Sequence, residues 1–206
     1  MSRPPSPPLV LASASPRRAE ILRMLGLSPV VSPTHVHEEL LPGEGPEEHV
    51  LRLAEQKAAK GHVAHPEALV LAGDTAVVLD DLILGKPADP DQATSMLLML
   101  QGRTHRVMTG LALALPGGDV LSGVQTTAVT FRRFGEAEAR DYVSTGEPMD
   151  KAGAYGIQGM GAALVERFDG DYFNVVGLPV PLLIGLFRDA GWAYGFGRLE
   201  PLSSDS

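Results

Sequence analysis

The segment from Leu9 to Gly26 constrains the fold most, because it predicts a buried strand that turns directly into a helix. Leu9–Ala12 is a short apolar run typical of an interior strand. Ser15 is a good helix N-cap, Pro16 suits the first helical position, and Gly26 closes the helix. The free amide groups of such a junction, together with the positive end of the helix dipole, favour a bound anion.

Side chains around this predicted junction strengthen the hypothesis of an anion site. They are two hydroxyls and two guanidinium groups: Ser13, Ser15, Arg17 and Arg18. Arginine suits bidentate recognition of phosphate. Taken alone, the segment could equally be a capped helix whose arginines are solvated, so the rest of the chain must decide between the two interpretations.

The composition limits the compartment and the partners. The 206 residues carry a net charge of −8, which argues against a nucleic acid polymer as partner, whereas a small phosphate ligand needs only a local basic cluster. The chain has no cysteine, which fits a reducing compartment, and we expect a cytoplasmic protein. No apolar run approaches the roughly 18 residues of a membrane span, so we expect no membrane association.

Helical and strand patterns alternate along the chain, which predicts an α/β class with a mixed sheet. We expect one catalytic domain over residues 9–194, a disordered Pro-rich leader over 1–8 and a flexible tail over 195–206. The expected helices cover residues 16–25, 46–59, 90–100, 135–145 and 181–190. The expected strands cover residues 9–12, 69–72, 76–79, 82–84, 107–115, 120–131 and 162–165.

Acidic and basic side chains next to these elements could carry chemistry. Asp74 directly follows the apolar run 69–72, and a carboxylate at a strand end is a frequent catalytic position, although it could also cap a turn. Lys57 lies at the edge of a helix's apolar face, where it either contacts phosphate or extends to solvent. Glu38 and Glu39 offer hard oxygen ligands for a magnesium ion beside a phosphate.

Two further segments suggest contacts to a ligand. Gly85-Lys86-Pro87 is not a P-loop, because proline follows the lysine and no helix begins there, so Lys86 is predicted to be a point charge that reaches a phosphate. The glycine-rich stretch 150–159 could wrap a planar or phosphorylated ligand with its amides, or form an ordered surface loop. Its Gln158 offers a donor and an acceptor suited to the edge of a base.

Six segments occurring in order resemble the Maf family of nucleoside triphosphate pyrophosphatases. They are LASASPRRAEIL at 11–22, LAEQKA at 53–58, GDT at 73–75, GKP at 85–87, GRTHRVMTG at 102–110, and EPMDKAGAYGIQG with GDYFNVVGLP at 147–159 and 170–179. The resemblance covers nearly everything from Leu9 to Ala190. It implies a mixed α/β fold related to inosine triphosphate pyrophosphatases, two lobes around a central cleft, frequent homodimers and a divalent cation, Mg²⁺ or Mn²⁺.

The resemblance also implies roles for individual residues. Asp74 corresponds to the family's catalytic proton acceptor. The counterparts of its phosphate-binding residues are Ser13, Lys57 and Lys86. The counterparts of the residues that decide substrate choice are Arg17, Thr75 and Gln158. Glu38 or Glu39 corresponds to the metal-binding acid, with Asp74 as a further metal ligand.

The GAYGIQG sequence at 153–159 resembles the dTTP/UTP-cleaving branch of the family rather than the 7-methyl-GTP branch. We therefore expect a nucleoside triphosphate substrate, cleaved to the monophosphate and pyrophosphate. Asp74 either takes the proton of the attacking water or holds the metal that activates it, and both roles stay open here. A nucleotide-binding regulator of septum formation without turnover, and a phosphatase that releases orthophosphate, are the alternatives.

Overall fold

A single mixed sheet organises the chain. The structure is a computed structural model, and it describes residues 7–202. The seven strands of this sheet follow the order β2-β1-β3-β5-β6-β7, with β4 paired to β3. They are β1 (Leu9–Leu11), β2 (Val30–Val31), β3 (Leu69–Leu79), β4 (Leu82–Leu84), β5 (Thr104–Ala114), β6 (Val120–Phe131) and β7 (Val165–Asp169). Strand β1 runs parallel to β2 and β3, whereas every other neighbouring pair is antiparallel, so the predicted mixed α/β class is confirmed.

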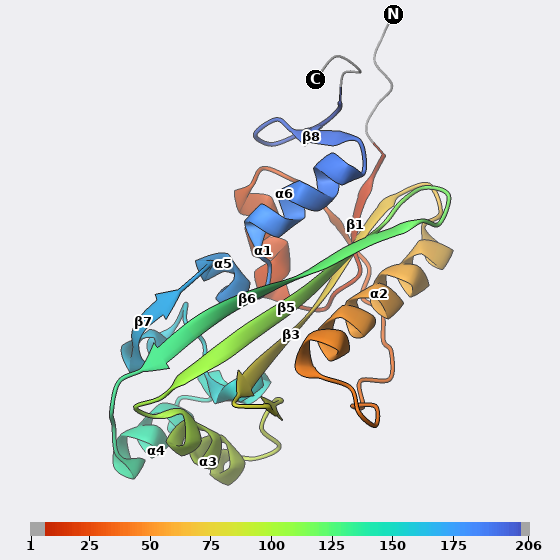
Figure 1. Cartoon of the computed structure of the whole chain (residues 1–206). Coiled ribbons are helices and arrows are strands. Elements are labelled where there is room, and N and C mark those ends of the chain that lie inside the picture. The colour runs from red at the N-terminus through yellow and green to blue at the C-terminus, as the bar shows by residue number, and fades with distance from the viewer. Residues whose placement is uncertain (1–6, 203–206) are drawn as a thin grey trace, which may run out of the picture.

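Helices lie at both ends of the long strands, and α2 (Pro46–Ala64) packs along the sheet between these ends (Figure 1). The other helices are α1 (Pro16–Met24), α3 (Pro90–Leu100), α4 (Glu136–Ser144), α5 (Tyr172–Val176) and α6 (Val180–Asp189). Helices α1 and α6 lie toward one end, and α3 and α4 toward the other, while β3, β5 and β6 run between them. The two largest clusters of the apolar core follow this arrangement, one around Leu22 and Phe187 and the other around Leu97 and Phe131.

The helix starts test the predicted caps. At α3 the Asp89 side chain accepts a hydrogen bond from the Gln92 amide at 2.8 Å, so Asp89 is the N-cap residue. The Gln92 side chain accepts from the Ala88 amide and not from the Asp89 amide, so the expected capping box is not closed. At α1 Ser15 occupies the predicted N-cap position and Pro16 begins the helix, but the Ser15 side chain makes no capping hydrogen bond. Its amide donates instead to Ser13 Oγ at 3.2 Å, which orders the turn between β1 and α1.

Small residues let α2 lie unusually close to the sheet. A side chain at Gly110 of β5 would clash with the Val50 carbonyl of α2, and a Cβ on Gly61 would lie 2.8 Å from Val70. Alanines fill most of the remaining interface between α2 and the sheet. Helix α2 continues to Ala64, beyond the expected end at residue 59, because Gly61 allows its last turns to stay packed on the sheet. This close approach brings Lys57 to β3.

Strand β3 corrects the expectation that a strand ends just before Asp74. It continues through Asp74, because β5 pairs with it from Val70 to Val78. On its other edge, β1 pairs with residues 69–71 and β4 with residues 77–79, and no described strand pairs with the stretch between them. Asp74 therefore lies at an opening in the sheet, which we call the β3 opening.

Both ends of the described chain differ from expectation. Leu199–Pro201 forms β9, which pairs with β8 (Trp192–Tyr194), so the predicted flexible tail is wrong for these residues. The Tyr194 hydroxyl donates to the Leu25 carbonyl at 2.6 Å, which fastens the hairpin to the end of α1. At the other end, the Pro8 carbonyl accepts a hydrogen bond from Leu69. The rest of the leader and tail predictions, at residues 1–6 and 203–206, lie outside the described residues. Within residues 7–202, no helix is long and apolar enough to cross a membrane.

Candidate active site

One lysine joins two acidic side chains at the β3 opening. Lys57 Nζ lies 2.7 Å from Asp74 Oδ1 and 2.6 Å from Glu38 Oε1. The side chains of Lys57 and Asp74 are only 10% and 17% exposed, so their attraction is screened less than that of a surface pair. Burial acts to raise the pKa of Glu38, but the hydrogen bond and charge of Lys57, aided by the charge of Lys86, lower it overall. We call these three contacting residues the acidic cluster.

The structure separates Glu38 from Glu39, which the sequence left as alternatives. Glu38 belongs to the acidic cluster, whereas Glu39 is 82% exposed and its nearest ionic neighbour is His37, at 3.8 Å. Arg52 of α2 fixes this segment, because its guanidinium donates to the Glu39 carbonyl and twice to the Glu44 carboxylate. The hydrogen bond from Arg52 holds the pKa of Glu44 far below its usual range. The loop before α2 is thus held with Glu38 facing the β3 opening.

A buried arginine ties two of the predicted site residues together. Arg18 is 9% exposed, and its guanidinium donates to Ser13 Oγ at 2.8 Å, to Thr75 Oγ1 at 3.1 Å and to the Gly177 carbonyl at 2.8 Å. Thr75 also shares a hydrogen bond of 2.9 Å with Thr109 of β5. The predicted phosphate-binding Ser13 is therefore held beside Thr75, which follows Asp74 in the strand.

Arg17 occupies a different place from its neighbour Arg18. Its side chain is 29% exposed and lies 3.4 Å from the Asp150 carboxylate, which belongs to the 3₁₀ helix η1 (Glu147–Asp150). The same carboxylate lies 2.6 Å from Lys151 Nζ. The contact between Arg17 and Asp150 joins α1 to the segment that precedes the glycine-rich stretch. Arg17 is thus the more accessible of the two arginines for a ligand.

Gln158 lies in a loop whose amides are engaged within the protein. The Gly156 amide donates to the Tyr142 hydroxyl, and the Met160 and Gly161 amides donate to the Glu147 carboxylate. Within the predicted stretch 150–159 the Gly156 amide is therefore not free for a ligand, and the Met160 and Gly161 amides just beyond it are also engaged. The Gln158 side chain is exposed and makes no hydrogen bond within the described part of the chain. Lys86 is exposed as well, and the Gly85 carbonyl beside it accepts a hydrogen bond from Gly153 of this loop.

The acidic cluster bears on the predicted metal site. Glu38 and Asp74 each contact the Lys57 ammonium, so both carboxylates face one position that holds a positive charge. Oxygen ligands of this kind suit Mg²⁺ or Mn²⁺. Among residues 7–202 no group of three or more acidic or histidine side chains could hold a metal. The two carboxylates therefore fit a cation that takes its other ligands from phosphate and water, and Glu39 lies apart from them.

Sequence reasoning missed several residues that organise the site. Arg52 and Glu44 lie eight residues apart across a helix start, and Glu147 contacts amides 13 and 14 residues further along the chain. No short-range pattern signals such pairs. Arg18 was predicted at the correct junction, but no local pattern distinguishes this buried arginine from the more accessible Arg17.

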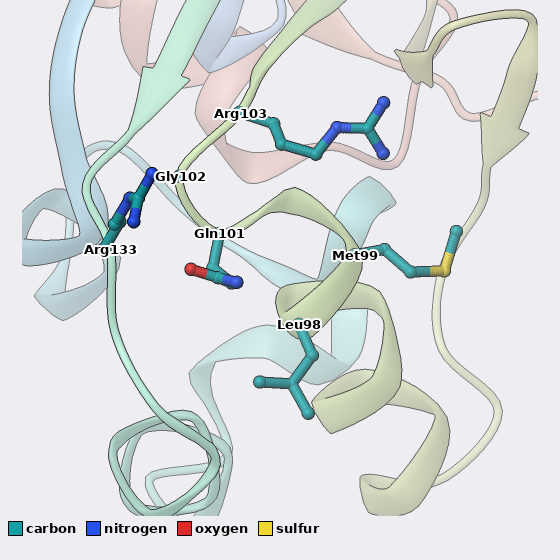
Figure 2. Close-up of a pocket in the computed structure, with 6 residues that line it drawn as sticks. All are labelled: Leu98, Met99, Gln101, Gly102, Arg103 and Arg133. Carbon is teal, nitrogen blue, oxygen red and sulfur yellow. The ribbon is translucent and has the colours of Figure 1, made fainter.

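A separate cavity of about 550 Å³ lies at the C-terminal end of α3 (Figure 2). Its lining contains none of the predicted site residues and consists of Leu98, Met99, Gln101, Gly102, Arg103 and Arg133. Arg103 is already paired with the Asp80 carboxylate at 2.9 Å. The cavity is thus distinct from the β3 opening.

The fold and the site define an α/β protein that gathers basic and acidic side chains at an opening in its sheet. The chain belongs to the Maf-like protein family, whose model matches residues 8–190. A relative named dTTP/UTP pyrophosphatase from Anaeromyxobacter dehalogenans (strain 2CP-1) is 50% identical over 94% of this chain and 99% of its own. Another of the same name, from Koribacter versatilis (strain Ellin345), is 47% identical over 89% and 94%.

A solved structure is also similar to part of this chain. It is titled a nucleoside-triphosphatase / dITP/XTP pyrophosphatase from Mycobacterium abscessus. The match covers 61% of this chain and 74% of that chain, with 18% identity and a TM-score of 0.40. A similarity this low supports no functional comparison.

Proposed function

We propose that this protein hydrolyses dTTP, UTP and related pyrimidine nucleoside triphosphates to the monophosphate and pyrophosphate. The observation that carries the proposal is the acidic cluster at the β3 opening, where Lys57 holds Asp74 and Glu38 beside the basic junction of β1 and α1. Relatives that are 47–50% identical along most of the chain and named dTTP/UTP pyrophosphatase support the choice of substrate.

We assign Asp74 as the general base that takes the proton of the attacking water. The water oxygen forms a bond to the α-phosphorus, the bond from that phosphorus to the bridging oxygen breaks, and pyrophosphate leaves. The proton of the water passes to Asp74, whose carboxylate is held in place by Lys57 at 2.7 Å. No covalent intermediate is needed, so the protein's contribution is positioning and electrostatic stabilisation.

Basic and hydroxyl side chains would hold the triphosphate. Arg17 and Lys86 are both accessible and offer positive charge to it. Ser13 and Thr75 are fixed by Arg18, which keeps their hydroxyls at the β1–α1 junction. A Mg²⁺ or Mn²⁺ ion held by Glu38 and Asp74 would offset phosphate charge and lower the pKa of the attacking water.

Gln158 is the residue we assign to recognition of the base. Its exposed amide presents one donor and one acceptor, and the uracil or thymine edge presents a carbonyl beside an N–H. A site that pairs polar groups in this way rejects ligands that leave those groups unpaired. We therefore propose that dTTP and UTP are preferred to CTP and ATP.

The identity of the products tests this function. The purified protein is incubated with Mg²⁺ and dTTP, UTP, CTP, ATP or 7-methyl-GTP, and pyrophosphate and orthophosphate are measured separately. We expect pyrophosphate, formed fastest from dTTP and UTP. Binding without turnover would favour the regulator of septum formation, orthophosphate would favour a phosphatase, and a preference for 7-methyl-GTP would move the protein to the other branch.

The homodimer and the cytoplasmic location stay predictions. Light scattering on the purified protein measures the mass of the assembly directly, and a mass near 22 kDa would contradict a dimer, since one chain has a mass of 21.8 kDa.

A further inference from the structure

We propose that Glu147 is a positioning residue for base selectivity, because its carboxylate closes the loop that carries Gln158. The loop meant here is residues 147–161, which we call the Gln158 loop. The inference rests on the proposed function, since it assigns a role to the scaffold of the residue that would contact the base. Glu147 itself would touch neither the substrate nor the reacting atoms.

The carboxylate of Glu147, at the start of the Gln158 loop, binds two amides at the end of the loop. Glu147 Oε2 accepts a hydrogen bond from the Met160 amide at 2.8 Å, and Oε1 accepts one from the Gly161 amide at 3.0 Å. Oε1 also accepts one from the Tyr142 hydroxyl at 2.8 Å, and that hydroxyl accepts one from the Gly156 amide at 3.1 Å. Glu147 thus links helix α4, the start of the loop and its end in one hydrogen-bonded ring.

Two glycines of the loop, Gly159 and Gly161, are explained by this ring. A side chain at Gly159 would collide with the Glu147 carboxylate, and a Cβ on Gly161 would lie 2.5 Å from the Tyr142 hydroxyl. At Gly156 a Cβ would lie 2.8 Å from the Lys151 side chain. The backbone must pass close to these groups, so Gly159 and Gly161 serve the closure of the loop around Glu147.

The ring leaves a short exposed tip that contains Gln158. On one side of the tip, Ile157 is buried against the α1–α6 lobe, and Tyr155 is buried with its hydroxyl 2.9 Å from His105 of β5. On the other side, the Met160 and Gly161 amides are held by Glu147. The backbone is therefore held in place on both sides of Gln158, and on the C-terminal side it is held by one carboxylate, that of Glu147.

The substitution Glu147→Gln removes this fixing with little change of shape. A carboxylate offers acceptors at both oxygens, whereas an amide offers one oxygen and one NH₂ group. Whichever way the amide is turned, its NH₂ group faces at least one of the donors that Glu147 now satisfies. The end of the loop is then released, and the geometry at Gln158 changes. Small displacements of a positioned group have large effects on rate, of the order of 100-fold for 1 Å.

We expect Glu147→Gln to lower the ratio of kcat/KM for dTTP to kcat/KM for CTP by at least about tenfold. Inhibition by inorganic pyrophosphate, which probes the phosphate site without a base, should change by less than about twofold. The matched control is Glu136→Gln, an acid-to-amide change on α4, where the residue is 58% exposed and paired with Arg140. The control should keep both the selectivity ratio and the pyrophosphate inhibition.

Tyr142→Phe provides a second, independent variant. It removes the hydroxyl that donates to Glu147 and accepts from Gly156, so it should also lower the selectivity ratio. If Glu147→Gln does not fold, this variant decides alone. A purely structural role for the ring predicts that dTTP and CTP activity fall in equal proportion, and that result in the folded variants overturns the inference. Unprotected Met160 and Gly161 amides in hydrogen exchange of the native protein would overturn it as well.

The native protein separates failure of this inference from failure of the proposed function. If the native protein does not release pyrophosphate or treats dTTP and CTP alike, the proposed function fails before any variant is made. If the native protein prefers dTTP and both variants keep that preference, the role of Glu147 is refuted and the proposed function stands.

Discussion

Replacing Asp74 by asparagine should separate catalysis from folding. Asparagine has nearly the same shape, so its side-chain oxygen can still accept the hydrogen bond from Lys57 that Asp74 accepts at 2.7 Å. It cannot take up the proton of the attacking water. A positioned general base contributes typically 10²–10⁴-fold to a rate, so we expect kcat to fall by at least about 100-fold, which corresponds to about 2.7 kcal/mol in the barrier.

The structure also indicates a small effect of Asp74→Asn on stability. Removing one partner of a buried ion pair usually costs about 3–5 kcal/mol, because a charge is left without a partner. Here Lys57 keeps Glu38 at 2.6 Å, and the three formal charges of the acidic cluster, two negative and one positive, become one of each. We therefore expect the free energy of unfolding to change by no more than about 1 kcal/mol.

Pyrophosphate release and urea unfolding measure the two effects on the same preparation. Asp80→Asn is the matched control, because Asp80 is 77% exposed on the turn that follows β3 and its carboxylate is paired with Arg103 on the surface. Its φ of 54° is one that asparagine tolerates well. The control should keep native turnover. Turnover within a few fold of native in Asp74→Asn would remove Asp74 from the mechanism.

Three further predictions concern other parts of the molecule. Arg17→Lys should lose most of the activity that Arg17→Ala loses, because lysine cannot form two parallel hydrogen bonds to phosphate; a fully active lysine variant, judged by kcat/KM for dTTP, would contradict bidentate binding. Gln158→Leu should reduce the preference for dTTP over CTP more than it reduces the rate with dTTP, and steady-state kinetics with both nucleotides would show an unchanged preference if Gln158 does not contact the base. Burial lowers the pKa of His105 from 6.5 to about 4, so between these values the unfolded chain takes up a proton that the folded chain does not. Stability should therefore fall as the pH is lowered from 6.5 toward 4, by at most about 3 kcal/mol from this residue, and urea unfolding of His105→Gln should show a weaker pH dependence than the native protein.

Local signals in the sequence predicted much of the fold. The start of α3 was predictable because Asp89 is a good N-cap residue, and its side chain accepts a hydrogen bond from the Gln92 amide. At α1 the Ser15 side chain makes no such capping bond. Ser13 Oγ instead accepts hydrogen bonds from the Ser15 amide and the Arg18 guanidinium. Short-range chemistry therefore predicted where these helices begin, but not which side chains satisfy each end.

The features of the site that could not be predicted from local sequence depend on contacts between distant segments of the chain. Asp74 was expected at a strand end, but β5 extends β3 through it, and the β3 opening arises because β1 and β4 pair with separate parts of the opposite edge. The choice between Glu38 and Glu39 depends on Arg52, which holds the intervening loop against α2. Each of these features needs a partner whose position is known only after the chain has folded.

Isotope labelling tests the central claim most directly, namely that water attacks the α-phosphorus at the β3 opening. The native protein is incubated with dTTP in ¹⁸O-labelled water under conditions of single turnover, and the products are separated and weighed by mass spectrometry. The account predicts one ¹⁸O atom in dTMP and none in pyrophosphate. Label in pyrophosphate, or release of labelled orthophosphate, would contradict it.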